Sequence, residues 1–171
     1  MKLKAALLLV LGCAAVSACG LQPMYAGGSN GTIARGLANV DVAPIEGRAG
    51  WLMRNALRDK LAPGGVDQGG ARYVLTVKLD EQLTGLGLLS DDRISRESFA
   101  LRARYQLVDA ASGETLLDAT AGSDAGIDVV SSEYAVIAAE QTARENLANE
   151  VADRIITGIA LRLKAVEQGR K

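Results

Sequence analysis

The clearest chemical signal in this 171-residue chain surrounds Cys19. The small residues Ser17 and Ala18 precede it, after an apolar stretch, residues 5–15, that begins behind two lysines. This arrangement is typical of a secretory signal peptide, and the stretch is too short to cross about 30 Å of hydrocarbon as a helix. A cysteine directly after the cut has the form of a bacterial lipobox, in which the thiol is acylated. We therefore expect cleavage before Cys19 and a lipid on its sulfur.

Two alternatives to this assignment stay open. Cys13 also follows a lipobox-like run, although a cut there would leave an apolar core of only about six to eight residues. An ordinary secretory cut after Ala18 would leave Cys19 as a lone thiol, which is a liability in an oxidising compartment. A thioether-linked lipid removes that liability and would anchor the chain to a membrane. Gly20 follows the cysteine where Asp would cause retention, so sorting to the outer membrane is expected.

Catalytic chemistry finds little support, because the chain contains no histidine. This absence excludes a Ser-His-Asp or Cys-His hydrolase and a conventional zinc site. Asp91 and Asp92 form an acidic pair that is typical of a solvated turn, and Gly85 and Gly87 are not followed by the rest of a phosphate-binding motif. We predict no enzyme activity, no catalytic residue, no metal site and no cofactor apart from the covalent lipid on Cys19.

Basic residues are the remaining candidates for chemistry. The candidate anion contacts are Lys78, Arg93, Arg96, Arg102 and Arg104. Guanidinium groups clustered on a rigid sheet can bind phosphates or carboxylates through paired hydrogen bonds. The alternative is a solvated face whose charges are balanced by Asp80, Glu97 and Asp118. A net charge of −1 offers no basic footprint for nucleic acid.

The hydrophobic pattern predicts the elements that would hold these residues. Alternating apolar residues indicate strands, and apolar residues recurring every three or four positions indicate helices. The expected strands cover residues 37–45, 72–83, 93–109 and 114–122, and the expected helices cover residues 48–62 and 132–166. Loops are expected at residues 85–92 and 124–130, and Gly158 is expected to mark a bend in the last helix.

This β-α-β-β-β-α order predicts an α/β fold of the α+β type. The first crossover should be right-handed and should join two parallel strands. Strands with one apolar face need cover on that face only. We therefore expect a two-layer sandwich in which two helices cover one face of a four-stranded mixed sheet. The expected organisation is a signal peptide at residues 1–18, a lipidated N-terminus and tether at residues 19–36, and one domain at residues 37–171.

Three runs of the sequence resemble one family of envelope lipoproteins. Residues 19–25 (CGLQPMY) resemble the Cys-Gly-Phe-x-Pro-Leu-Tyr opening of the lipopolysaccharide-assembly lipoprotein family, LptE, with Leu21 and Met24 as apolar departures. Residues 105–116 (YQLVDAASGETL) are similar to the central hairpin of that family, and residues 132–140 (SEYAVIAAE) to the start of its last helix. The resemblance therefore extends over essentially the whole mature chain and includes the element order.

The resemblance implies a role and no reaction. Proteins of this family sit inside the lumen of a large outer-membrane β-barrel, LptD, assist its assembly and take part in delivering lipopolysaccharide to the cell surface. It implies an LptD-type barrel and lipopolysaccharide as partners, and a lipid-anchored domain on the periplasmic side, within the barrel lumen. By the same analogy, the basic sheet residues would contact lipid A phosphates. The alternatives are an auxiliary lipoprotein of an ABC-type envelope lipid transporter and a purely structural envelope lipoprotein.

Overall fold

The computed structural model describes residues 31–61, 70–88 and 94–169, so Cys19 and Arg93 lie outside the described ranges. Within these ranges the elements are, in chain order, α2 (Thr32–Ala38), β1 (Val40–Val42), α3 (Gly47–Leu61), β2 (Tyr73–Leu88), β3 (Ile94–Asp109), β4 (Thr115–Asp128) and α4 (Glu133–Gly169). None of the helices in this part of the chain combines the length and the apolar character needed to cross a membrane.

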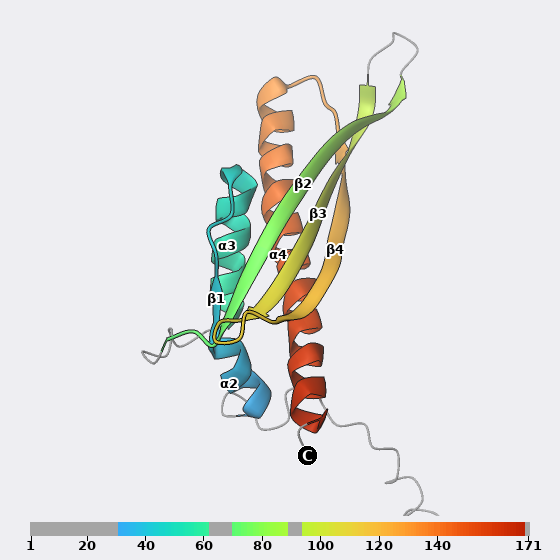
Figure 1. Ribbon diagram of the computed structural model, residues 1–171. Helices are drawn as coiled ribbons and strands as arrows, with labels where there is room; N and C mark the ends of the chain where they lie inside the picture. Colours follow the sequence, from blue (N-terminus) through green and yellow to red (C-terminus); the bar gives the residue numbers. More distant parts are fainter. Residues whose placement is uncertain (1–30, 62–69, 89–93, 170–171) are drawn as a thin grey trace, which may run out of the picture.

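The strands form one sheet in the order β1-β2-β3-β4. β1 runs parallel to β2, whereas β2, β3 and β4 are antiparallel neighbours. The long helices α3 and α4 pack on one face of this sheet and leave the other face open (Figure 1). The predicted fold class is therefore confirmed: a four-stranded mixed sheet has its two long helices on one face, and its first two strands are parallel.

The core lies between the sheet and these two helices. Alternate residues of β2 and β3 point into it, as the period of two requires. The buried core residues of these strands are Tyr73, Leu75, Val77, Phe99, Leu101, Ala103, Tyr105 and Leu107, and those facing them from α3 and α4 include Met53, Leu57, Leu147, Val151, Ile155 and Ile159. Removing this apolar surface from water at about 25 cal/mol per Å² is the main stabilising contribution. The ion pair between Lys60 on α3 and Asp153 on α4, at 2.7 Å, joins the two helices at their edge.

Helix α2 is a difference from the sequence prediction. Its seven residues follow Gly31 and include Gly36, so the segment resembles a linker in composition. In the structure Leu37 on α2 is 4% exposed and belongs to the core, which orders the preceding turn as a helix. The folded part therefore begins before residue 37, and the strand expected at residues 37–45 is reduced to the three residues of β1.

The strands β2 and β4 are also longer than predicted. β2 continues to Leu88 and β4 continues to Asp128, so strand structure replaces part of each predicted loop. Glycines and small residues interrupt the apolar alternation there, so the side-chain pattern does not predict a strand. Backbone pairing with β3 nevertheless continues, with Leu86 opposite Arg96 and Arg96 opposite Asp128. The acidic pair at residues 91 and 92 lies outside the described ranges.

Candidate functional site

The open face of the sheet carries most of the basic residues singled out in the sequence. Lys78 on β2 lies directly opposite Arg104 on β3, and Arg102 is the next residue along β3 on the same face. Arg96 occupies this face near the far end of the strands, opposite Leu86. The structure therefore brings Lys78, Arg102 and Arg104 together and places Arg96 apart from them.

Arg104 is held by a carboxylate from the neighbouring strand. Its Nε and Nη2 atoms donate to the two carboxylate oxygens of Asp118 on β4, at 3.1 and 2.9 Å. The side-chain amide of Gln106 donates to the same carboxylate at 2.8 Å. The hydrogen bonds from Arg104 and then from Gln106 lower the pKa of Asp118 to about 2, and Asp118 in turn raises the pKa of Arg104. Much of the charge of Arg104 is thus balanced within the sheet.

Two further arginines on β3 pair with acids on β4 in the same way. Arg102 lies 3.4 Å from the carboxylate of Asp124, and its Nη1 donates to the carbonyl oxygen of Ser123 at 3.0 Å. Arg96 lies 3.6 Å from the carboxylate of Asp128. The three arginines therefore form a ladder of ion pairs across the open face, where screening by solvent weakens each pair.

Glycines on β4 make room for these arginine side chains. A Cβ atom built on Gly122 would overlap the side chain of Arg102, which crosses directly above it. A Cβ atom on Gly126 would come within 3.0 Å of the guanidinium of Arg96. Because the strand carries no side chain at these two positions, both guanidinium groups can lie flat across β4 and reach the aspartates.

The acids expected to balance this face are only partly those observed. Asp118 pairs with Arg104 as expected. Glu97 does not lie on the open face: it shares the helix side of β3 with Phe99, because it is an even number of residues away. Asp80 lies opposite Arg102 in the register, yet its carboxylate is not among the ion-pair partners found in the described part of the chain. The aspartates of β4 beyond residue 122 were not predicted as partners, because the sequence pattern indicated a loop at residues 124–130.

Lys78 differs from the arginines of the ladder. Among the described residues, none forms an ion pair with its ammonium group. It borders a hollow of about 140 Å³ on the open face, together with Thr76, Arg104 and Gln106. An ammonium group, a hydroxyl group, an amide and one side of a guanidinium thus surround the same small volume. This combination of donors suits a single phosphate or carboxylate group.

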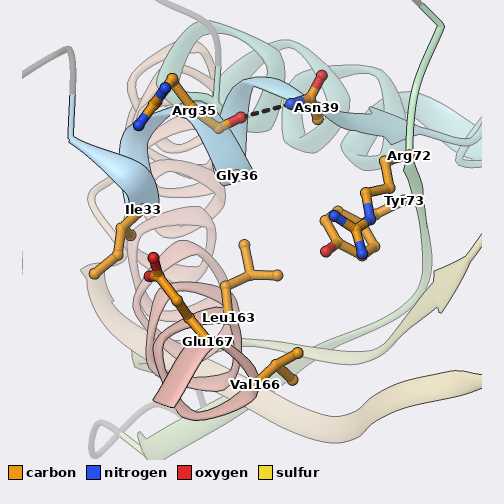
Figure 2. A pocket seen from close by; sticks show the side chains of 9 residues that line it. All are labelled: Ile33, Arg35, Gly36, Asn39, Arg72, Tyr73, Leu163, Val166 and Glu167. Atoms are coloured by element: carbon orange, nitrogen blue, oxygen red, sulfur yellow. Dashed lines mark hydrogen bonds between the residues drawn. The ribbon is translucent and has the colours of Figure 1, made fainter. Parts of the chain in front are cut away.

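A second and larger hollow, of about 430 Å³, lies where α2, the start of β2 and the end of α4 meet. Figure 2 shows Leu163 and Val166 of α4 between Glu167 on one side and Arg72 on the other. The guanidinium of Arg72 lies over the ring of Tyr73, 5.1 Å from its centroid. The sequence pattern does not predict this hollow, since one of its walls is the unpredicted helix α2.

Metal chemistry finds no support in the described part of the chain. No three His, Cys, Asp or Glu side chains within residues 31–61, 70–88 and 94–169 are placed to hold a metal ion. The polar groups of the open face are instead arranged as donor and acceptor pairs. What this arrangement can do chemically is recognise an anionic group in competition with its own aspartates.

Comparisons with known proteins give a consistent result. The sequence matches the LptE family, described as lipopolysaccharide-assembly, over residues 37–159. A lipoprotein structure from Caulobacter crescentus CB15 is 30% identical, with a TM-score of 0.64, and the match covers 77% of this chain and 96% of that one. No curated protein matches the sequence.

Two more distant structures share the fold. The minor lipoprotein from Acinetobacter baumannii is 14% identical with a TM-score of 0.58, and the match covers 72% of this chain and 92% of that one. The rare lipoprotein B from Shewanella oneidensis is 13% identical with the same TM-score, and the match covers 75% and 96% of the two chains.

Proposed function

This chain belongs to the LptE family of lipopolysaccharide-assembly lipoproteins, and from that membership we propose that it plugs an LptD-type β-barrel, assists its assembly and takes part in lipopolysaccharide transport. The family is described as lipopolysaccharide-assembly, which supports a role of this chain in that process, and it is an outer-membrane-associated family of non-enzymatic lipoproteins. The match over residues 37–159 is the observation that carries the proposal, because it covers the sheet and most of the last helix.

The dimensions of the domain support a place inside a barrel. The 37 residues of α4 extend over about 55 Å, and the 16 residues of β2 and of β3 extend over about 53 Å. The elements lie roughly side by side and form an elongated body (Figure 1). The apolar band of an outer-membrane barrel is only about 25 Å tall. A body of this length could therefore extend through the whole lumen, with its open polar face toward the water-filled interior.

The anchor would attach at one end of this body. Cys19 is the proposed acylation site, and residues 20–30 would join the lipid to α2. α2 lies beside the end of α4, whereas β2 ends and α4 begins at the opposite end (Figure 1). A lipid on Cys19 would thus hold the α2 end near the membrane surface. The opposite end would lie deepest in the barrel.

The open face is the surface that we propose for contact with lipid A phosphates. The candidate residues that lie on it are Lys78, Arg96, Arg102 and Arg104, and Arg93, which lies outside the described residues, stays a candidate from the sequence. The hollow beside Lys78 gives the strongest support for phosphate binding, because no acid among the described residues balances the ammonium group of Lys78. Arg104 can contribute one side of its guanidinium while Asp118 holds the other. A phosphate bound in this hollow would form an ion pair with the ammonium group of Lys78.

Purification of the native complex tests the proposal. The full-length chain, with a C-terminal affinity tag, is expressed in its own bacterium, extracted in mild detergent and purified. We expect a large heat-modifiable β-barrel in about equal molar amount, together with lipopolysaccharide. A tagged outer-membrane lipoprotein of another family is the matched control. Recovery of an inner-membrane transporter would favour the auxiliary-lipoprotein alternative, and recovery of the chain alone would contradict the plug.

A further inference from the structure

The two edges of the sheet differ in how far the backbone groups of the edge strand are hydrogen-bonded. At the β4 edge, α4 supplies arginines that hydrogen-bond to backbone carbonyl groups of the strand. Arg162 Nε donates to the carbonyl oxygen of Leu116 at 2.6 Å, and Arg154 donates to the carbonyl oxygen of Gly122. Side chains that occupy backbone acceptors in this way hinder the addition of another strand. The β4 edge is thus partly closed by the molecule itself.

At the other edge, β1 covers only the beginning of β2. The residues paired with β1 are Tyr73 to Leu75. The N–H group of Tyr73 donates to the carbonyl oxygen of Asn39, and the carbonyl oxygen of Leu75 accepts from the N–H group of Ala43. Odd-numbered residues of β2 therefore direct their backbone groups away from β3, toward the β1 side.

The same alternation continues beyond the end of β1. The register with β3 stays in step from residue 73 to residue 86, so odd-numbered residues keep the same direction. The residues whose N–H and C=O groups face this edge are Val77, Leu79, Glu81, Leu83 and Gly85. They extend over about 27 Å, and no strand of the described part of the chain pairs with them. An exposed edge of this length is a template for another strand.

Side chains along this edge restrict the partner. Leu79 and Leu83 lie on the helix side of the sheet, and Leu83 is 48% exposed there. Glu81 lies between them, and its carboxylate is 3.6 Å from Arg144 of α4. The opposite side of the strand is polar, with Lys78 and Asp80. A strand added here would therefore need apolar residues toward the helices and polar residues toward the open face.

Glu81 also bears on whether the partner is a second copy. An antiparallel pairing of two copies centred on this free edge would place Glu81 of one copy directly opposite Glu81 of the other. Like charges directly opposite each other destabilise a strand pair. Charge thus favours a different protein, with a neutral or basic residue beside Glu81.

We propose that the edge of β2 between Val77 and Gly85 is a docking site for an extended, amphipathic segment of a different protein, which joins the sheet as a further strand. The inference rests on the proposed function in one respect: the barrel is the protein expected to supply the segment. Backbone hydrogen bonds would give affinity, and the alternation of apolar and polar side chains on either side of Glu81 would give specificity.

A proline substitution tests the backbone contacts. Leu83→Pro removes an N–H group that faces the free edge and leaves the donors to β3 in place. The matched control is Leu83→Ala, which also loses the side chain but keeps the N–H group. In the tagged purification, we expect Leu83→Pro to recover at least about fivefold less barrel than Leu83→Ala. Equal recovery with both variants folded, judged by circular dichroism, would overturn the proposal.

Photo-crosslinking tests the same edge without a proline. A benzoylphenylalanine replaces Gln82 or Thr84, which flank the edge, and Thr120 on β4 is the control. We expect crosslinks from the two β2 positions to one segment of a second protein, identified by mass spectrometry, and none to it from position 120. Crosslinks to another copy of the chain or to residues 19–30, or no crosslink, would overturn the proposal. If the β2 positions crosslink to a second protein but the tagged chain purifies without a barrel, the docking site stands and only the proposal that the chain plugs a barrel is refuted.

Discussion

The ring of Tyr105 on β3 packs directly against the backbone of Gly158 on α4. A methyl group at position 158 would overlap the hydroxyl oxygen of Tyr105. A glycine in the middle of a helix is about 1 kcal/mol less favourable than alanine. Its presence here allows the helix to approach the sheet at Tyr105, which is only 4% exposed. α4 continues as one helix through this residue, so close packing is the role that the structure supports.

Gly158→Ala should therefore destabilise the protein despite the better helix propensity of alanine. We expect the free energy of unfolding to fall by about 1–3 kcal/mol, because the added methyl group must displace the tyrosine or the helix. Urea unfolding followed by circular dichroism measures the change. Gly169→Ala is the matched control, since no atom lies within 4 Å of the added carbon. Adding Tyr105→Phe, which removes the overlapping oxygen, should restore part of the loss; equal stability of the two single variants would contradict this account.

Leu57 on α3 is fully buried, whereas Trp51 on the same helix is 65% exposed. Leu57→Ala should lower the free energy of unfolding by about 2–5 kcal/mol, because it leaves a cavity between the helices and the sheet. Trp51→Ala removes a larger side chain but should change the free energy of unfolding by only about 0.5 kcal/mol. Chemical unfolding of both variants compares them. A larger loss for Trp51→Ala would mean that the exposed ring has a packing role which the isolated chain does not show.

The ion pair of Asp118 with Arg104 makes the stability of the fold depend on pH in the acidic range. The pKa of Asp118 is lowered from 3.8 to about 2, first by hydrogen bonds from Arg104 and then by Gln106. A group whose pKa is lower in the folded state stabilises the fold above its unfolded pKa. This contribution should thus be complete above about pH 4 and should be lost as the pH falls toward 2.

Carbon-detected NMR of the Asp118 carboxyl group measures this pKa. Arg104→Ala should raise it toward 3.8, and Gln106→Ala should raise it by a smaller amount, following the order of the two causes. A value that stays near 2 in Arg104→Ala would show that another donor holds the carboxylate.

The fold could be predicted from side-chain periodicity wherever one face of an element is buried. The alternation from Tyr73 to Leu79 and from Phe99 to Leu107 identifies β2 and β3, and the two amphipathic helices follow from the same rule. The prediction failed where a single buried side chain or backbone pairing holds the element in place. α2 depends on one buried side chain, Leu37, and the far ends of β2 and β4 depend on pairing with β3.

The candidate site shows the same limit. Alternation is enough to place Arg102 and Arg104 on one face, but it does not identify their partners. Asp124 and Asp128 could not be assigned because they follow the point at which the apolar pattern of β4 stops. Gly122 gives no signal in a sequence, although its missing side chain lets Arg102 cross the strand. Partners on a neighbouring strand depend on register, which periodicity does not contain.

The lipid anchor on Cys19 stays a prediction of the sequence. Cys19→Ala should abolish incorporation of labelled palmitate, because the thiol is the atom that would be acylated. The protein should then be released from the membrane pellet unless the barrel retains it. Cys13→Ala is the matched control and should be labelled like the unchanged chain, since Cys13 would be removed with the signal peptide. Labelling that persists in Cys19→Ala would refute the anchor, and loss of labelling in Cys13→Ala would move it to residue 13.

Lys78 and Asp118 should affect lipopolysaccharide binding in opposite directions. Lys78→Gln removes the cation that no described acid balances, so we expect affinity to fall about two- to fivefold. Asp118→Asn releases Arg104 from its competing carboxylate, so affinity should rise by a similar factor. Binding of lipopolysaccharide to the detergent-solubilised chain is measured at low and high salt, and both effects should shrink at high salt. Arg58→Gln removes the same charge from an exposed position on the helix side and should leave affinity unchanged. If Lys78→Gln and Arg58→Gln behave alike, net charge and not the hollow governs binding, and the open face is not the contact surface.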